Sequence, residues 1–337
     1  MIAVTGGSGF LGAHLLLLLT QQNDKIKASR RKNTDLSFAR RVFDLYSEQP
    51  DSYWQRIQWE EVDLLDRFEL DDFLADVNQL YHCAAEVSFE PSKRQQMMQS
   101  NVKMTAAIVN QCLLKEDIRL CHVSSIAAIG RSRLEEPIAE DRFWKNDPNN
   151  TWYAISKYFA EREVWRGIEE GLNAVIINPA IILGYTHWDE GSGKFFDNIW
   201  RGTPYYTKGI TGWVDVHDVA KAMVWLMSQP ITAERFILSE GNHAYREILN
   251  MIADALHKPR PDKYAGRWLS GFAWRIEKMR SWLTKKEPLI TKETAITGRL
   301  ACYYENKKWL TISPFPFTPI KETIAQTASL FMKERGK

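Results

Sequence analysis

The sequence predicts an α/β protein in which a doubly wound parallel sheet carries a smaller C-terminal substrate lobe. The first observation is a short apolar strand that runs into a glycine-rich turn and an apolar helix within residues 1–22. The second is a series of apolar, strand-like segments that alternate with helix-like stretches, as in βαβ units. The third is the pair Tyr153 and Lys157, which share one helix face because residues i and i+4 point the same way.

Composition places the chain among ordinary globular proteins. It has 337 residues, 45% hydrophobic and 26% charged, enough for one large domain or two modest ones. A net charge of +2 gives no strong field for nucleic acid. The four cysteines form no C-x-x-C pair and lie at no zinc-ligand spacing, so we expect reduced thiols and no metal site. The leucine run at 15–19 is too short to cross a bilayer and follows no basic segment, so we expect a cytoplasmic protein.

The first turn of the chain, TGGSGFLG, has the strand–turn–helix context of a dinucleotide-binding loop. Gly6 allows a tight turn, Gly9 lets a pyrophosphate approach the backbone, and Gly12 lets the helix pack closely on the strand. The free N–H groups at the helix start then face the phosphates. The alternative is a tight turn that binds nothing. The expected cofactor contacts here are Thr5, Gly6, Ser8, Gly9, Phe10, Leu11 and Gly12.

The spacing T-G-x-x-G-x-x-G, together with the later Y-x-x-x-K, resembles the short-chain dehydrogenase/reductase superfamily. Chain length and later motifs are similar to its extended branch, the NAD-dependent epimerase/dehydratase group, in its dihydroflavonol-reductase-like and hydroxysteroid-dehydrogenase-like forms. The resemblance implies a Rossmann-type cofactor domain from residues 1–184 plus about 214–238. It implies a substrate-binding lobe from about 185–213 and 239–330.

The end of the second predicted strand, residues 25–29, favours NADP(H) and leaves NAD(H) open. An NAD site usually has a carboxylate there for the ribose 2′-hydroxyl, but Asp24 comes too early and Asp35 too late. Instead Arg30 and Arg31 follow the strand, and a guanidinium can bind a 2′-phosphate through two hydrogen bonds. By resemblance Arg30 is the first choice and Arg31 the second. The alternative is a solvated basic loop.

The resemblance implies further cofactor contacts along the sheet. Asp63 would accept from the adenine amino group, the small Ala84 and Ala85 would let the backbone approach the cofactor, and the backbone after Pro179 would meet the nicotinamide amide. The cofactor residues expected in this part of the chain are Asp63, Leu64, Ala84, Ala85, Ser124, Tyr153, Lys157, Pro179 and Ile182.

The resemblance also implies a catalytic set of Ser125, Tyr153, Lys157 and Asn101. Tyrosine has an ordinary pKa near ~10, and a nearby ammonium would lower it. Lys157 would therefore tune Tyr153 as the acid/base, and Ser125 would anchor the substrate oxygen beside it. Ser124 is the fallback for Ser125, since serines at strand ends commonly just close turns.

Substrate contacts are expected from Glu86, Gly130 and Asn178. An asparagine at the place of Asn178 contacts substrate in the sugar-nucleotide epimerases that it resembles. Plant dihydroflavonol reductases carry an asparagine where this chain has Gly130, so the sequence gives no support for a flavonoid. Eight aromatic residues between 185 and 213 favour a bulky apolar or ring-containing substrate, although some of them are expected in the core.

Residues 264–286 have the pattern of a basic amphipathic helix. Its apolar side chains recur at helical spacing, and its basic ones lie mostly elsewhere on the wheel. Three interpretations stay open: a helix that covers the small domain, weak contact with a membrane surface, or a lid over a lipophilic substrate.

Three functions are compatible with these motifs. The first is an NADP-dependent oxidoreductase that reduces a ketone or aldehyde of a bulky small molecule. The second is a sugar-nucleotide epimerase or dehydratase, with Asn178 at the substrate and Arg235 or Arg299 at its pyrophosphate. The third is a non-catalytic NADPH-sensing protein, although such relatives commonly lose the tyrosine. The resemblance also implies a homodimer built on the helix that carries Tyr153.

Overall fold

The computed structural model describes residues 1–88, 91–115, 117–131, 136–147, 150–266 and 292–336. The predicted amphipathic helix at 264–286 therefore lies almost entirely outside the described residues. Across the part of the chain that the structure describes, every helix is too short or too polar to cross a bilayer.

A seven-stranded sheet forms the centre of the molecule, with strand order β10-β6-β5-β4-β1-β2-β3. All of its neighbouring strands are parallel, which confirms the predicted doubly wound α/β class. The order reverses between β1 and β4, and cofactors bind at such a switch point. Its strands are β1 (Ile2–Thr5), β2 (Ile26–Arg30), β3 (Ile57–Glu61), β4 (Gln79–His82), β5 (Arg119–Val123), β6 (Ala174–Pro179) and β10 (Glu234–Leu238).

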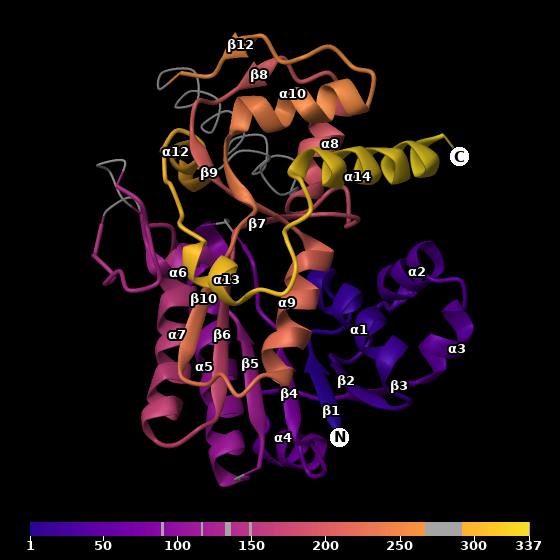
Figure 1. The fold of residues 1–337 in the computed structure, drawn as a ribbon, viewed down its shortest axis with the longest axis vertical. Helices are drawn as coiled ribbons and strands as arrows, with labels where there is room; N and C mark the ends of the chain where they lie inside the picture. The colour runs from indigo at the N-terminus through magenta and orange to yellow at the C-terminus, as the bar shows by residue number, and fades with distance from the viewer. Residues whose placement is uncertain (89–90, 116, 132–135, 148–149, 267–291, 337) are drawn as a thin grey trace.

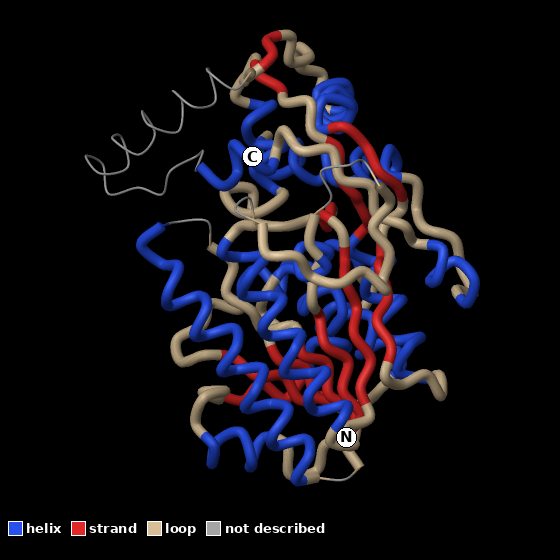
Figure 2. The backbone as a smooth tube through the Cα atoms, turned by 90° about the vertical axis from the view of Figure 1, so that its left-hand side faces the viewer, coloured by secondary structure: helices blue, strands red, loops and turns tan. Residues whose placement is uncertain are grey.

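Both faces of this sheet are covered by helices (Figure 1). Alternate residues of a strand point to opposite faces, so Val4 and Ala3 belong to two different apolar cores. The core around Val4 includes α1 (Phe10–Gln22), α2 (Ser37–Tyr46) and α9 (Val216–Ser228). The core around Ala3 includes α4 (Arg67–Phe73), α5 (Arg94–Leu114) and α7 (Trp152–Glu169), and Figure 2 shows α5 and α7 side by side along the sheet.

A third apolar core lies in the C-terminal part, above the sheet in Figure 1. A three-stranded sheet with order β11-β9-β7 packs there against three helices. Its strand β7 falls in the range predicted for the cofactor domain, so this small sheet crosses the predicted boundary. The elements are β7 (Ile181–Leu183), β9 (Ile210–Asp215), β11 (Gly241–Ala244), α8 (Gly193–Trp200), α10 (Tyr245–Ala255) and α14 (Ile320–Arg335).

Short elements complete the described chain. The strands β8 (Tyr205–Tyr206) and β12 (Lys263–Tyr264) pair with each other. The remaining helices are α3 (Pro50–Gln55), η1 (Pro91–Lys93), α6 (Ile126–Ile129), α12 (Lys292–Thr297) and α13 (Lys307–Ile312). Of these, α6 matters most for the site, because it begins directly after the end of β5.

Candidate active site

The glycine loop between β1 and α1 is tightly folded against β4. Gly6 has φ of +72°, and a Cβ there would lie 2.6 Å from the Ala84 backbone nitrogen. A Cβ on Gly12 would lie 2.1 Å from the Gly6 carbonyl oxygen. Gly9 differs: it is exposed, and a Cβ there would meet only the Gly6 oxygen at 3.4 Å. Gly6 and Gly12 therefore close the turn, whereas Gly9 leaves its outer face open to a ligand.

The start of α1 fits an anionic group. Gly9 is the N-cap residue and offers no side chain to the free N–H groups, and the first turn holds no acidic residue. Phe10 and Leu11 begin the helix, with Leu11 buried. Thr5 is buried and hydrogen-bonds His82 Nδ1 through its hydroxyl at 2.7 Å, so its side chain is occupied inside the protein, while Ser8 is half-buried.

The end of β2 carries the two arginines in different surroundings. Arg30 Nη2 lies 3.0 Å from Glu61 Oε2 on the neighbouring strand β3. Arg31 is exposed, and its guanidinium forms no ion pair with another residue of the described ranges. The first-choice arginine is thus already paired, and the second is the more available one.

Asp63 follows β3 and folds its own turn. Its Oδ1 accepts a hydrogen bond from the Leu65 N–H at 2.9 Å, while Leu64 between them is buried. The N-cap of α4 is Asp66, whose side chain accepts from two backbone N–H groups of the first turn. A carboxylate has further lone pairs, so Asp63 retains acceptors for an adenine amino group.

The predicted catalytic side chains converge at the end of β5. Ser125 caps α6, accepting from Ala127 N at 3.2 Å, and its hydroxyl is near enough to the Tyr153 phenol to lower the pKa of that phenol. Lys157, one turn further along α7, is buried and donates from Nζ to the Val123 carbonyl at 2.8 Å. The structure therefore brings Ser125, Tyr153 and Lys157 to one place.

Burial sets the protonation of this group. Desolvation lowers the pKa of Lys157 to about 8, and the nearby Glu161 carboxylate opposes this shift. Desolvation also raises the pKa of Tyr153, and the nearby Ser125 hydroxyl offsets the rise only in part. This direction is opposite to the lowering that the sequence analysis expected. A neutral phenol at pH 7 is suited to donate a proton.

Asn101 on α5 fastens the loop after β4. Its Oδ1 accepts from the Glu86 N–H at 2.7 Å, and its Nδ2 donates to the Glu86 carbonyl at 2.9 Å. The same Nδ2 also lies 3.1 Å from Ser156 Oγ on α7. Ala84 and Ala85 come just before this clamp, and Ala85 is exposed. Asn101 is buried and holds this loop to the helix that carries Tyr153.

Two residues predicted to contact substrate, Asn178 and Gly130, have structural roles instead. Asn178 is fully buried in β6 and donates from Nδ2 to the Ser125 carbonyl at 3.0 Å and to Glu161 Oε2 at 2.7 Å. Gly130 is buried at the end of α6 with φ of +98°, a conformation that an asparagine would adopt only with strain. Both residues therefore support the site from within. Asn178 Oδ1 has no hydrogen-bond partner among the described residues, but the side chain is fully buried.

The remaining predicted cofactor residues are close to the same strand ends. Pro179 is the last residue of β6 and is buried, and Ile182 is half-buried in β7. Ser124 is buried and donates its hydroxyl to Glu161 Oε2 at 2.5 Å. Its side chain is thus occupied beneath the site.

Most aromatic residues that favoured a bulky substrate are instead core residues of the C-terminal part. Phe196 and Trp213 are fully buried, and Trp188 and Trp200 pack against Phe331 at ring centroid distances of 4.9 and 5.7 Å. Tyr205 is the exception, at 44% exposed. These residues stabilise the third core, so they give little support for a ring-shaped substrate.

Sequence reasoning missed Glu161 as part of the site. It lies on α7 at positions i+4 from Lys157 and i+8 from Tyr153, so the three share one helix face. An acidic residue on this otherwise buried face was the available signal. Arg235, assigned to a pyrophosphate in the epimerase hypothesis, pairs with Glu161 at 2.7 Å.

A parallel sheet with a glycine loop at its first turn and a Ser–Tyr–Lys group beside the switch point defines a dinucleotide-dependent oxidoreductase of the extended short-chain type. Residues 2–237 match the model of the NAD-dependent epimerase/dehydratase family, and the chain belongs to this family. It is an enzyme that uses a nicotinamide dinucleotide to oxidise or reduce a small molecule.

Several curated proteins are similar over most of the chain. A putative dihydroflavonol 4-reductase of Synechocystis sp. is 28% identical over 97% of this chain and 93% of its own. A cinnamoyl-CoA reductase of Medicago truncatula is 26% identical over 75% and 80%. A sterol demethylase protein B of Methylococcus capsulatus is 27% identical over 77% and 75%.

Solved structures share the fold. The dTDP-glucose 4,6-dehydratase DesIV of Streptomyces venezuelae, with NAD and TYD bound, has a TM-score of 0.77 at 18% identity, covering 99% of this chain and 98% of its own. The enzyme WbmH of Bordetella bronchiseptica, in complex with NAD+, has a TM-score of 0.73 at 19% identity, covering 100% and 99%.

Proposed function

We propose that this enzyme reduces a ketone or aldehyde group of a bulky small molecule with NADP(H), and runs reversibly with the matching alcohol. The observation that carries the proposal is the placement of Ser125 at the start of α6 and of Tyr153 and Lys157 one turn apart on α7, with Lys157 Nζ bound to the Val123 carbonyl two residues before Ser125. The open outer face of Gly9 and the uncapped start of α1 fit the cofactor pyrophosphate. The bound cofactor supplies the hydride.

Each catalytic residue has one task in this proposal. Ser125 donates a hydrogen bond to the carbonyl oxygen and holds it beside the Tyr153 phenol. Tyr153 then gives its proton to that oxygen as negative charge develops there. Its raised pKa in the free protein keeps the phenol protonated, and so able to donate, at pH 7. The ammonium of Lys157 stabilises the phenolate that remains. Asn101 keeps the neighbouring loop in place through Glu86.

The preference for NADP(H) rests on the basic end of β2. A 2′-phosphate would meet Arg31 first, because Arg30 is held by Glu61. Arg30 can join only by exchanging that carboxylate for the phosphate, which carries more negative charge. No carboxylate takes the place at the strand end that an NAD-specific ribose contact needs.

Support for a bulky substrate now comes from the relatives. The names of three of them refer to reduction or demethylation of a dihydroflavonol, a cinnamoyl thioester or a sterol. The epimerase/dehydratase alternative loses two of its residues, because Asn178 and Arg235 bind Glu161 inside the protein. Its third residue, Arg299, does not carry that alternative alone.

A homodimer is proposed as the assembly, as the family resemblance implies. Trp152 and Phe159 on α7 are 41% and 39% exposed and lie seven residues apart, so they share one side of the helix. Such apolar surface is suited to meet a second copy. Light scattering should give a dimer for the wild type and a monomer for Phe159→Arg.

The first experiment identifies the nucleotide that co-purifies, by denaturing the protein and analysing the supernatant by mass spectrometry. The second follows NADPH and NADH oxidation with a dihydroflavonol, cinnamoyl-CoA and a ketosteroid as probes. An empty protein that turns over one probe faster with NADPH supports the proposal. Near-stoichiometric bound NAD and no net oxidation of either cofactor would favour an epimerase or dehydratase.

A further inference from the structure

Glu161 is a buried carboxylate with a full set of donors. Its side chain is 3% exposed. Oε2 accepts from Ser124 Oγ at 2.5 Å and from Asn178 Nδ2 at 2.7 Å. Oε1 accepts from Arg235 Nη1 at 2.7 Å and from Trp165 Nε1 at 3.2 Å. The donors come from the end of β5, from β6, from β10 and from α7 itself.

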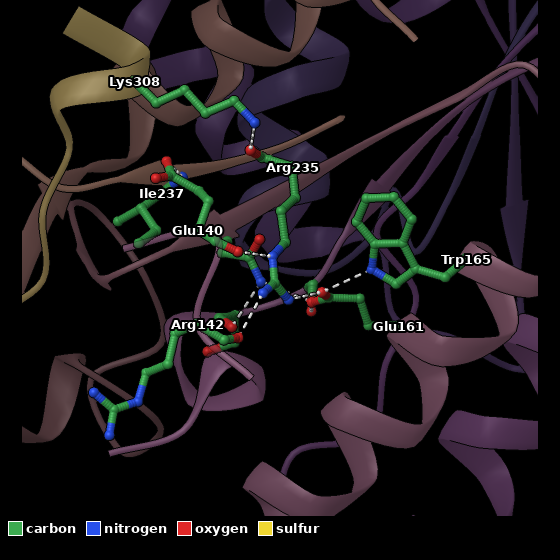
Figure 3. A network of polar contacts seen from close by, with 10 residues as sticks. Glu140, Arg142, Glu161, Trp165, Arg235, Ile237 and Lys308 are labelled. Carbon is green, nitrogen blue, oxygen red and sulfur yellow. Dashed lines mark hydrogen bonds and ion pairs between the residues drawn. The ribbon is translucent and has the colours of Figure 1, made fainter. Parts of the chain in front are cut away.

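The partner guanidinium is held as firmly. Arg235 lies between Glu161 and the segment around Glu140, as Figure 3 shows. Its Nε donates to the Glu140 carbonyl at 2.7 Å and its Nη2 to the Arg142 carbonyl at 3.0 Å. The Glu140 carboxylate in turn accepts from the Ile237 N–H at 2.8 Å, on the edge strand β10.

Stability alone is a poor reason for such a pair. Two buried charges cost several kcal/mol each in desolvation, and apolar residues of similar size often stabilise a core as well or better. Breaking the pair by removing one partner, however, is costly. We therefore infer the role of this ion pair from the residues that it contacts.

Through Glu161, the ion pair contacts the segment at the end of β5 that carries Ser125. The three last residues of this segment are each bound by a side chain: Lys157 binds the Val123 carbonyl, Glu161 binds the Ser124 hydroxyl, and Asn178 binds the Ser125 carbonyl. Since Asn178 also donates to Glu161, two of the three contacts run through this carboxylate. The end of β5 is thus fixed to the helix that carries Tyr153.

Glu161 also acts on Lys157, one helical turn before it. Desolvation lowers the pKa of this lysine to about 8, and the negative charge of Glu161 opposes the shift. The other groups that act electrostatically with Lys157 are His82 on β4, Cys83 directly after it, and His122 on β5. Burial lowers the pKa of both histidines, which leaves them neutral at pH 7, and raises that of the thiol to about 12.

We propose that Glu161 is a positioning residue for the reaction proposed above: it holds the end of β5 against α7 and places a negative charge beside the Lys157 ammonium. This inference rests on the proposed function for its kinetic consequences. The electrostatic part rests on the i+4 spacing of two buried charged residues on α7 and needs no substrate. Arg235 forms the ion pair with Glu161, and its own bonds to the Glu140 and Arg142 carbonyls keep it in place.

The first test measures protonation without any substrate. Lysine labelled with 13C is followed by NMR from pH 6 to 11, and the Lys157 signal is assigned by its loss in Lys157→Met. We expect Glu161→Gln to lower the Lys157 pKa by about one unit, because a removed anion disfavours the charged form. The matched control is Glu169→Gln, the same change at an exposed position of α7, which should leave the value unchanged. An unaltered Lys157 pKa in folded Glu161→Gln would overturn the electrostatic part.

The second test measures positioning through turnover of whichever probe compound the enzyme reduces. Glu161→Gln should lower kcat at least about tenfold and leave KM and the NADPH Kd within about twofold, since the groups it holds act in the chemical step. Ser124→Ala removes only the hydrogen bond from Ser124 to Glu161 and leaves the Glu161–Arg235 ion pair intact. It therefore tests positioning if Glu161→Gln does not fold. We expect a kcat about three- to tenfold lower for Ser124→Ala, with the Lys157 pKa unchanged. Full kcat in that variant would overturn the positioning role.

The two tests separate this inference from the proposed function. A lowered Lys157 pKa in Glu161→Gln, with no probe reduced by the wild type, would leave the Glu161–Lys157 coupling standing and remove the reductase. If the wild type reduces a probe and neither variant changes kcat or the Lys157 pKa, the reductase stands and the role of Glu161 is removed.

Discussion

The two ends of the proposed cofactor site are built differently. At the nicotinamide end, Ser125 and Lys157 are held by buried polar contacts that several strands and helices share. At the adenosine end, Arg30 and Glu61 form a pair whose side chains are 28% and 45% exposed. Exposed pairs contribute about 0–1 kcal/mol, whereas a buried polar group that loses its partner costs about 1–3 kcal/mol. In the proposed site, the catalytic groups are thus held by rigid contacts, and the groups expected to choose the cofactor by contacts that exchange readily.

The glycine loop joins the two ends, and its substitution should have the largest effect on the fold. In Gly12→Ala the added Cβ would meet the Gly6 carbonyl oxygen, which is backbone and cannot rotate away. We expect the free energy of unfolding to fall by about 3 kcal/mol, at the upper end of overpacking costs, and NADPH binding to be lost. Urea denaturation and fluorescence titration measure the two.

Gly9→Ala is the matched control for this change. The space around Gly9 accommodates a Cβ, so stability should change by less than about 0.5 kcal/mol, as is usual away from packed features. NADPH affinity should nevertheless drop, since the pyrophosphate is expected against this glycine. Equal NADPH affinity in Gly9→Ala and wild type would place the cofactor elsewhere.

Asn101→Ala tests how rigid the nicotinamide end is. The change leaves the N–H and the carbonyl of Glu86 without their side-chain partner. Stability should fall by about 1–3 kcal/mol, the cost of unsatisfied buried groups. Turnover should fall with it, while NADPH binding at the adenosine end persists. Thermal unfolding and steady-state kinetics on one preparation would show this, and unchanged values for both would mean that the clamp is dispensable.

The pH dependence should separate the two ends as well. Lys157 loses its proton as pH rises through about 8, so turnover should decline above that value while NADPH binding does not. Unfolding is not the cause, because the pKa of this buried lysine lies below its unfolded value. Between about 8 and 10.5 the unfolded chain binds more protons, and the lysine's contribution to stability rises with pH. A decline in turnover that tracks a fall in thermal stability would contradict this account.

The smallest effect is expected at Glu61→Gln. Without the carboxylate, Arg30 becomes free to meet a 2′-phosphate. NADPH should bind about two- to fivefold more tightly, as expected for release of an exposed pair worth up to about 1 kcal/mol, and NADH should be unaffected. The gain should shrink in high salt because such charges are screened. A gain for NADH of the same size would show that Glu61 acts on something other than the phosphate.

Local spacing made the nicotinamide end predictable in outline. Tyr153 and Lys157 share a face because of their separation alone, and the glycine loop is a contiguous motif. The partners beneath them were not predictable, since Glu161 and Arg235 are 74 residues apart and meet only because β10 lies beside β6. Asn178 was predicted at the substrate by resemblance to sugar-nucleotide epimerases, but β6 lies between two other strands and all of its residues are buried, Asn178 among them.

The C-terminal part was less predictable for a different reason. Its aromatic residues favoured a bulky substrate, with only some of them expected in the core, whereas this part has to build an apolar core of its own from short elements. Large side chains such as Trp213 and Phe196 bury the most apolar area per residue. A small core made of short elements is therefore built mainly from such side chains. Composition alone does not distinguish a core aromatic from a lining one.

Replacing Tyr153 with phenylalanine tests the central claim most directly. NADPH affinity and the turnover of the best probe compound would be measured on the same preparation as the wild type. The account predicts an NADPH Kd within about twofold and a turnover lower by about 10²–10⁴, the usual contribution of a positioned proton donor. Turnover close to the wild-type value, with the variant folded and NADPH bound, would contradict the assignment of Tyr153 as the acid and with it the mechanism.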